Sequence, residues 1–351
     1  MAALTLELLR VPSPTGQEGA LADLVEARVA ALGPRVRRAR LGQTVVARIE
    51  PTPGRPTLGL FGHLDTVAGH LADPVREEGG RIFGCGASDM KGGLAVMLHL
   101  LAARAAAEEG AGLVCVFYDG EEGPYAASGL ARLLAASFPL LHGLDLAVCL
   151  EPTGGEIQVG CLGVLNALVR FTGRAAHSAR PWLGENAIHK AAPFLARVAA
   201  LAPRPVTIQG LTYHEVLSVT TARSHDARNV VPDRFELNVN VRFAPGRTAL
   251  DARQELLALV AGEGEVEVVD EAPAGPVVLD HPLVERVRRL AGAPVGPKQA
   301  WTDVARLGAA GIPAINYGPG EPAQAHRPGE WVAVASLEAT AAALARLLEE
   351  G

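Results

Sequence analysis

Four apolar runs of the sequence, TLGLF, VCVFY, LAVCL and IPAIN, are each followed by side chains that could bind a metal ion. In an open α/β sheet the carboxyl ends of neighbouring strands meet at one edge, so we expect these side chains to converge there. They are His63, Asp65, Asp119, Glu121, Glu122, Glu151 and His326. A Gly-rich loop, residues 84–93, adds Asp89 just before the next apolar segment.

Carboxylates gathered at one sheet edge repel one another unless a cation neutralises them. Imidazole together with carboxylate is the ligand set that Zn²⁺ and similar divalent ions prefer. Each of these residues alone would ordinarily be a solvated surface group, so the prediction depends on their shared placement. The sequence therefore predicts a metal site.

His63 and Asp65 are two residues apart, so in extended backbone their side chains share a face. We expect the Asp65 carboxylate to accept the proton from the ring nitrogen of His63 that does not bind metal. The alternative is that Asp65 caps a helix.

The order of the segments predicts an α/β domain with a buried, largely parallel sheet. Helix-period segments near residues 17–32, 93–109 and 126–136 alternate with the apolar runs, and Thr15 to Glu18 has the pattern of a capping box. After Cys161 the pattern changes to a compact α+β unit with helices near 186–201 and 248–260. Helices near 281–290 and 337–349 resume the first pattern. We therefore expect a catalytic domain of residues 1–162 and 274–351, with residues 163–273 inserted as a smaller domain.

Composition and charge limit the classes of function. The chain has 351 residues, of which 49% are apolar and 20% charged, which is typical of a globular protein of about two domains. Its net charge of −6, without any block of like charge, excludes an electrostatic nucleic-acid binder. The apolar region Leu94 to Ala107 contains His99 and Arg104 and is too short to span a bilayer. Four cysteines without CxxC spacing indicate free thiols, so we expect a cytoplasmic protein with no nucleic-acid or membrane partner.

The segments GHLDTV, GASDMKGG, DGEEG, LEPT, GRAAHSARP and a late AH resemble the metallo-aminoacylase superfamily of dizinc exopeptidases, deacetylases and desuccinylases. The resemblance covers essentially the whole chain in order. It implies a zinc-exopeptidase-like catalytic domain with an inserted α+β lid domain that dimerises. It also implies two divalent metal ions per chain, with Zn²⁺ as the first expectation and Co²⁺ or Mn²⁺ as alternatives.

The resemblance assigns the metal ligands residue by residue, as a bridging carboxylate and two pairs. These are Asp89 for the bridge, Glu122 with His326 for one ion, and His63 with Glu151 for the other. It makes Glu121 the general base, which agrees with the chemistry that a carboxylate beside a dinuclear metal site can perform. Glu121 could instead be a fifth acidic ligand or a structural charge. In this superfamily the peptide bond after the bridging Asp is commonly cis.

Within the inserted domain, the resemblance implies that His177 stabilises the oxyanion in the active site of a partner subunit, so that a homodimer forms through this domain. A lone His at a strand end is otherwise usually a surface group. Arg242 is similar to a residue that binds a substrate carboxylate, for which a guanidinium has suitable geometry; the alternative is a cross-strand ion pair. The other substrate-binding residues that the resemblance implies are Arg174, Asn229, Thr302, Gly318 and Gly320.

The segments NVNVRFAP and AWTDVARLGAAGIPAINYGPGEP look most like the actinobacterial type of succinyl-diaminopimelate desuccinylase, which acts on a small N-acyl amino acid. Two features depart from the superfamily: Cys85 stands where many relatives have Arg, and the Trp-containing approach segment of many deacetylases is absent. The alternatives are an acetylornithine-type deacetylase, a carrier-protein lysine or ornithine hydrolase, and a metallo-carboxypeptidase.

Enzymes of other types fit less well. A serine hydrolase would need a G-x-S-x-G motif, which the sequence lacks. A cysteine hydrolase built on Cys85 would have neighbouring acids, which raise the pKa of a thiol. A non-catalytic binding relative would be expected to lose a metal ligand or the base, yet all six residues are present.

Overall fold

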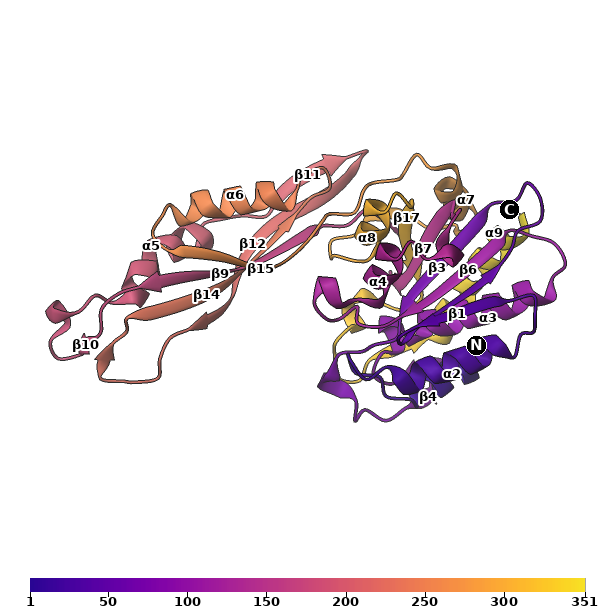
Figure 1. Cartoon of the computed structure of the whole chain (residues 1–351), viewed down its shortest axis with the longest axis horizontal. Coiled ribbons are helices and arrows are strands. Elements are labelled where there is room, and N and C mark those ends of the chain that lie inside the picture. The colour runs from indigo at the N-terminus through magenta and orange to yellow at the C-terminus, as the bar shows by residue number, and fades with distance from the viewer. Residues whose placement is uncertain (351) are drawn as a thin grey trace. The chain divides into compact units, whose positions relative to one another are not determined.

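The computed structural model describes residues 1–350, and these fold into two compact units (Figure 1). The first comprises Met1–Gly160, Val278–Pro297 and Arg306–Gly351, and the second comprises Cys161–Val277 and Lys298–Ala305. The second unit is thus an insertion in the first, and it includes a short segment, 298–305, that we had expected in the catalytic domain. The chain leaves the first unit near residue 160 and returns to it near residue 278.

The first unit is built on an eight-stranded sheet in the order β1-β2-β6-β3-β7-β17-β8-β16. Strand β3 pairs in parallel with both β6 and β7, and β17 continues the parallel pairing beyond β7. The eight strands of this sheet are β1 Arg37–Leu41, β2 Thr44–Ile49, β3 Thr57–His63, β6 Gly112–Tyr118, β7 Leu146–Pro152, β8 Ile157–Val159, β16 Val295–Pro297 and β17 Ala314–Gly318. Strands β3, β6 and β7 are buried along their whole length, as expected for parallel strands covered on both faces.

Helices and a small second sheet complete this unit. Helix α3 is buried almost throughout and packs against α1 and α9, while α7 packs on α9. The helices are α1 Ala2–Leu9, α2 Gly19–Ala30, α3 Gly92–Ala106, α4 Gly129–Ala135, α7 Pro282–Ala291 and α9 Val334–Glu350, together with α8 Val304–Ala309, whose first two residues belong to the second unit. The small sheet, in the order β18-β5-β4, joins Trp331–Ala333 to Arg81–Phe83 and Arg76–Glu78.

The start of α3 lies unusually close to the end of β7. A Cβ atom added to Gly93 would stand 2.7 Å from the carbonyl oxygen of Leu150, so only glycine fits there. This contact brings the loop before α3, which contains Asp89, next to the strand that contains Glu151.

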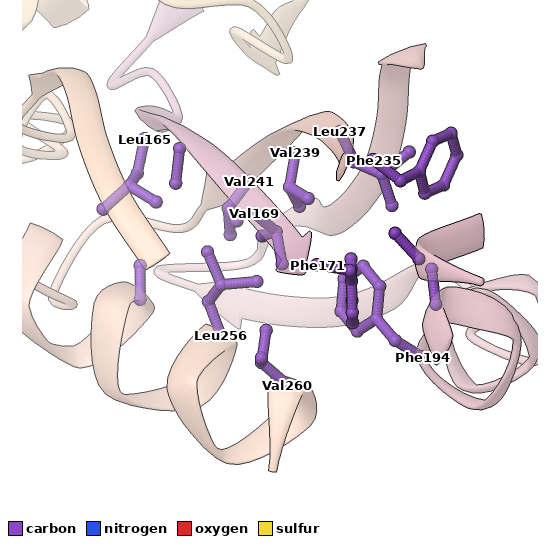
Figure 2. Close-up of a cluster of buried hydrophobic side chains, with 14 of the residues drawn as sticks. Leu165, Val169, Phe171, Phe194, Phe235, Leu237, Val239, Val241, Leu256 and Val260 are labelled. Carbon is purple, nitrogen blue, oxygen red and sulfur yellow. The ribbon is translucent and has the colours of Figure 1, made fainter. Parts of the chain in front are cut away.

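The second unit has a five-stranded antiparallel sheet in the order β11-β12-β14-β9-β15, with α5 and α6 on one face (Figure 1). In β14 buried residues alternate with half-buried ones, as expected for a sheet with one covered face. Figure 2 shows the core between this face and the helices, where Phe194 of α5 and Leu256 of α6 meet the strand side chains. The elements are β9 Gly163–Thr172, β11 Arg204–Ile208, β12 Leu211–Arg223, β14 Arg234–Phe243, β15 Glu265–Ala272, α5 Ala187–Ala199 and α6 Ala249–Val260, with the short strands β10 Ala176–His177 and β13 Val230–Val231.

The predicted capping box at Thr15 and Glu18 is wrong. Helix α2 begins at Gly19 without a side-chain cap. Thr15 instead donates a hydrogen bond to the Asp65 carboxylate, and Glu18 accepts from the backbone amide of Gly16. Both polar groups are used within the loop, so neither remains to cap the helix.

Within residues 1–350, no helix combines the length and the apolar character that crossing a membrane requires.

Candidate metal centre

The predicted metal ligands come together at the carboxyl ends of the central strands of the first unit. His63 is the last residue of β3, and Glu151 lies near the end of β7. Glu122 follows β6, Asp89 lies in the turn before α3, and His326 lies in the segment between β17 and β18. The five come from five separate parts of the chain, as the sequence analysis expected from the strand order.

Asp89 lies between the two imidazoles. Its Oδ1 atom is 3.1 Å from Nε2 of His63, and its Oδ2 atom is 3.5 Å from Nε2 of His326. Nε2 of His326 is also 2.7 Å from Oε1 of Glu122. Each oxygen of the Asp89 carboxylate therefore faces a different imidazole, which is the arrangement required of a carboxylate that bridges two ions.

Three overlapping groups of potential ligands have their donor atoms within 4.8 Å of one another. The groups are His63 with Asp89 and Glu151, His63 with Glu121 and Glu122, and Asp89 with Glu122 and His326. Only His326 is substantially exposed, since half of its side chain is accessible to solvent. The cluster is therefore a largely enclosed set of nitrogen and oxygen donors.

The carboxylates strongly favour positive charge at both imidazoles. Hydrogen bonds that the His326 ring donates to the carboxylates of Asp89 and Glu122 raise the pKa of His326 to about 10. Burial lowers the pKa of His63, but the Asp89 hydrogen bond and the carboxylates of Glu121, Asp89 and Glu151 outweigh it and raise the pKa well above its ordinary value. Burial likewise raises the pKa of Asp89, yet its hydrogen bonds to the two imidazoles hold that pKa below its ordinary value.

A site that retains protons on two imidazoles is one in which acidic groups outnumber the cations available to neutralise them. Divalent ions in place of those protons would balance the charge and use the same nitrogen and oxygen donors. The donor set therefore fits divalent metal ions.

The expected hydrogen bond between His63 and the Asp65 carboxylate is wrong in detail. Nδ1 of His63 is 2.8 Å from the backbone carbonyl oxygen of Asp65 and 3.6 Å from its carboxylate. The carboxylate is used elsewhere: it accepts hydrogen bonds from the backbone amides of Glu121 and Glu122, each at 3.0 Å, and from the Thr15 hydroxyl. Asp65 thus orients His63 through its main chain and holds the Glu121 loop through its side chain.

Asp119, included among the converging acids, does not take part in the cluster. Its carboxylate accepts hydrogen bonds from the Thr44 hydroxyl and the Arg132 guanidinium, and its backbone carbonyl accepts from the amide of Gly129. These contacts close the base of the loop that carries Glu121 and Glu122. Asp119 is therefore a structural group because its cation partner is already present in the chain.

The loop that carries Asp89 is held by a residue from another part of the chain, Glu330, which the sequence did not predict. The peptide bond Asp89–Met90 is cis, and the backbone amides of Gly86, Ser88 and Asp89 all donate to the carboxylate of Glu330. Burial raises the pKa of Glu330 to about 7, although the three amide donors act in the opposite direction. Contacts to main-chain amides leave no pattern of residue types in the sequence. The available signal was a lone Glu immediately before the apolar strand WVA.

The residues assigned to the inserted domain lie in the second unit. His177 in β10 pairs with Val230 of β13, and the amide of Ser178 donates to the carbonyl of Asn229, so His177 and Asn229 lie near each other at one end of this strand pair. His177 and Asn229 are exposed. Arg174 is exposed as well and forms an ion pair with Glu185 at 3.3 Å, so its guanidinium already has a partner.

Arg242 does not form the cross-strand ion pair considered as an alternative, because no acidic partner lies within ion-pair distance among residues 1–350. Its Nε donates to Oδ1 of Asn240 at 3.0 Å, and burial lowers its pKa. Thr302, also in the second unit, is buried, and its hydroxyl has no hydrogen-bond partner among the described residues.

Gly318 and Gly320 lie in the first unit beside the metal ligands. A Cβ atom on Gly318 would stand 2.2 Å from the carbonyl oxygen of Leu150, and one on Gly320 would stand 2.6 Å from Oγ of Ser88. Both glycines therefore allow their segment to approach the strand of Glu151 and the loop of Asp89.

Comparison with known proteins places these features in a wider group. The model of peptidase family M20/M25/M40 matches residues 59–350. The chain is 42% identical over 348 residues to a Mycobacterium tuberculosis protein that carries the name succinyl-diaminopimelate desuccinylase DapE, with 98% of this chain and 97% of that protein covered. It is 38% identical to the succinyl-diaminopimelate desuccinylase of Corynebacterium glutamicum, covering 99% and 95% of the two chains. It is 31% identical, with the same coverage, to an Aeropyrum pernix protein named as a LysW-lysine/LysW-ornithine hydrolase.

Solved structures show the same fold at lower identity. A tripeptidase from Staphylococcus aureus superposes with a TM-score of 0.79 at 19% identity, covering 99% of this chain and 96% of its own. A dinuclear metal-binding peptidase from Bacillus subtilis superposes with a TM-score of 0.69 at 16% identity and the same coverage.

Proposed function

The chain belongs to peptidase family M20/M25/M40, and on that premise we propose that it removes the succinyl group from N-succinyl-diaminopimelate or a closely related N-acyl amino acid. As a member of this family it is a metal-dependent hydrolase of amide bonds. The observation that carries the chemical part of the proposal is Asp89, whose two carboxylate oxygens face two different imidazoles.

Two divalent ions, with Zn²⁺ as the first candidate and Co²⁺ or Mn²⁺ as alternatives, would be held by the five clustered ligands. Asp89 would bridge them, with His63 and Glu151 on one side and Glu122 and His326 on the other. When bound, such a pair of ions polarises the amide carbonyl and lowers the pKa of a water molecule. His63 and Glu151 are buried and 12% of the Asp89 side chain is exposed, so bulk solvent has little access to these groups.

Glu121 would act as the general base. A carboxylate oxygen of Glu121 lies within 4.8 Å of the potential ligand atoms of His63 and Glu122. The backbone amide of Glu121 donates a hydrogen bond to the Asp65 carboxylate at 3.0 Å, which fixes its position. The Glu121 carboxylate would take the proton of the attacking water as the water oxygen bonds to the amide carbon. It would then give that proton to the amine nitrogen as the carbon–nitrogen bond breaks, releasing succinate and the free amine.

The second carboxylate of a succinyl or diaminopimelate substrate needs a cation that is not already paired. Arg242 supports this role because it is half-buried, burial lowers its pKa, and it has no ion-pair partner among residues 1–350. Asn229, Thr302, Gly318 and Gly320 remain proposed contacts of the substrate. Arg174 is the weakest of the set because Glu185 already neutralises it.

We also propose a homodimer formed through the second unit. Strand β12 pairs with β11 only from Leu211 to Glu215, and no strand among residues 1–350 pairs with that edge of its second half. An open strand edge of this kind is a template for pairing with a second chain. The exposed His177 would then donate to the oxyanion in the partner's site.

The dimer proposal is tested by complementation. His177→Ala and Glu121→Gln chains, each inactive alone, should recover activity when refolded together, because one mixed site would contain both residues. Heterodimers that form and remain inactive would place the oxyanion donor in the same chain.

The four free cysteines support the further proposal that the protein works in the reducing cytoplasm.

A hydrolysis panel tests the substrate. Metal-reconstituted protein should cleave the N-succinyl amide with a kcat/KM at least tenfold above that of the N-acetyl amide of the same amine, because a partly desolvated guanidinium disfavours substrates that leave it unpaired. Arg242→Ala should raise KM mainly for the succinyl substrate. Arg170→Ala is the matched control, since Arg170 lies in the same sheet but is neutralised by Glu236 and Glu267.

The same panel separates the alternatives. Equal kcat/KM for the succinyl and acetyl amides would favour an acetylornithine-type deacetylase, and preferential cleavage of dipeptides would favour a metallo-carboxypeptidase. Release of lysine or ornithine from a carrier protein would favour the activity named for the Aeropyrum pernix relative. A metal-loaded chain that cleaves none of these substrates would favour a non-catalytic binding protein.

A further inference from the structure

The loop that carries Asp89 is attached to the segment after His326 by a series of hydrogen bonds. The Glu330 carboxylate accepts from the amides of Gly86 and Ser88, both at 2.7 Å, and from that of Asp89 at 2.9 Å. The Glu330 carbonyl accepts from the amide of Gly84, and the Trp331 carbonyl accepts from the Ser88 hydroxyl at 2.8 Å. Four residues of the loop are thus held by two consecutive residues.

Glu330 is almost completely buried, with 2% of its surface accessible. No Lys, Arg or His lies within ion-pair distance of it in the part of the chain that the structure describes. A buried carboxylate is costly, and this cost is offset here by its three amide donors and by the buried ammonium of Lys91, which lies beyond ion-pair distance but still interacts with it. An apolar side chain would leave these three amides without their acceptor, so the carboxylate serves the main chain of the loop and not the packing of the core.

The position of Glu330 in the chain links these contacts to the metal centre. Glu330 is four residues after His326, and its contacts fix the backbone of Asp89 itself. The segment 326–330 therefore supplies one potential metal ligand directly and anchors the loop of another. A displacement of this segment would therefore disturb both ligands.

We infer that Glu330 is a positioning residue of the metal centre, which fixes Asp89 between the His63 and His326 sides by binding the amides of its loop. The inference rests on the proposed dinuclear function. Glu330 does not reach the cluster of donor atoms itself, so it acts on the metals through the main chain of Asp89.

Metal affinity of the Glu330→Gln variant tests this role. The amide has the size of the carboxylate, but its NH₂ group would face at least one backbone N–H and could not accept from it. Loss of an outer contact to a ligand typically lowers metal affinity by about 10- to 100-fold. Competition with a chromophoric chelator should therefore show Zn²⁺ or Co²⁺ binding at least tenfold weaker than in the unaltered chain.

Glu338→Gln is the matched control. Glu338 is exposed on α9, and its substitution makes the same change of charge near the same part of the sequence. It should leave metal affinity within twofold of the unaltered protein. If Glu330→Gln lowers the Tm of the metal-free protein but also leaves metal affinity within twofold, Glu330 is a structural residue only and the inference is overturned.

Hydrogen exchange provides a measurement that does not depend on the folding of a variant. In the metal-free unaltered protein, the amides of Gly86, Ser88 and Asp89 should be protected, because Glu330 already holds them. Exchange at the rate of an unstructured loop would show that metal, and not Glu330, orders the loop, and this would overturn the inference.

These measurements use no substrate, so they separate this inference from the proposed activity. A chain that binds two metals but does not cleave N-succinyl amides would refute the substrate while leaving the result for Glu330 valid. A chain that binds no divalent ion would overturn both.

Discussion

The two units bury acidic side chains in opposite ways. In the second unit, the buried Glu215 accepts hydrogen bonds from Arg204 and Arg247, and both arginines also pair with Glu255. This network, which we call the Glu215 network, contains its own cations. In the first unit, the carboxylates of Asp89 and Glu122 meet imidazoles at the metal centre, and these carboxylates raise the pKa of the imidazoles.

The comparison separates structural from functional acidic groups. Burial alone does not distinguish Glu215 from Glu151, since about 5% and 6% of their surfaces are accessible. What differs is the source of the neutralising charge, which the chain supplies at Glu215 and a bound metal would supply at Glu151. Asp119 resembles Glu215 in this respect, because the chain supplies its cation, Arg132, although Asp119 lies two residues from Glu121.

The largest expected effect is on turnover. Glu121→Gln should lower kcat by about 10²- to 10⁴-fold, since it removes the base and leaves the ligand shell intact. Elemental analysis should still find two metals per chain. Glu109→Gln, at an exposed position after α3, is the control and should keep full activity. Activity of Glu121→Gln within threefold of the unaltered enzyme would show that Glu121 is not the base.

Metal removal should affect the two units differently. At a metal concentration of 100 times the Kd, binding stabilises the folded state by about 2.7 kcal/mol per site, and a chelator removes this. Hydrogen exchange should then increase near His63, Asp89 and His326 but remain unchanged in β9 and β14. An equal increase of hydrogen exchange in both units would contradict the difference in neutralising charge described above. Separately, full activity with one metal per chain would contradict a dinuclear site.

The Glu215 network should contribute stability without metal. Glu215→Gln leaves two arginines short of a carboxylate and should lower the free energy of unfolding by about 1 to 3 kcal/mol, measured by urea denaturation. Metal content should not change. A variant as stable as the unaltered protein would mean that the network is not stabilising.

The pH dependence of this effect has a definite sign. Burial raises the pKa of Glu215, but the Ala244 amide and the two arginines outweigh it and lower the pKa below the ordinary value of 4.5. The stabilisation is therefore present above pH 4.5 and is lost as the pH falls through the folded-state pKa. The stability difference between the unaltered protein and Glu215→Gln should accordingly shrink below pH 4.5.

The smallest effect is expected at the exposed pair of Glu285 and Arg288 on α7. Exposed pairs gain little because water and salt screen them. Glu285→Gln should leave both Tm and metal content unchanged within error. A loss of stability as large as that of Glu215→Gln would show that an exposed pair contributes as much to the free energy of unfolding as the Glu215 network.

The sequence predicted the parts of the molecule that depend on residue type and periodicity. The uniformly apolar runs became β3, β6 and β7, and the helices expected near residues 248–260 and 281–290 lie within about a residue of α6 and α7. The gathering of His63, Asp89, Glu122, Glu151 and His326 followed from their places after strands. The structure was needed for features set by main-chain contacts, such as the carbonyl of Asp65 that orients His63. It was also needed for α1 and α8, which are short and lack a clear apolar period.

The ligands of the metal centre are far apart along the chain. Glu122 and His326 are separated by 204 residues, and the Gly86 amide and its Glu330 acceptor by 244. During synthesis, the ribosome makes the whole second unit before His326 exists, so a growing chain has crowded acids and one imidazole but no closed site. Because closing so long a loop costs entropy before any contact is gained, we expect the metal to bind late and to fasten the two ends of the first unit together. Shortening the chain before residue 326 should therefore abolish tight metal binding even though four of the five ligands remain.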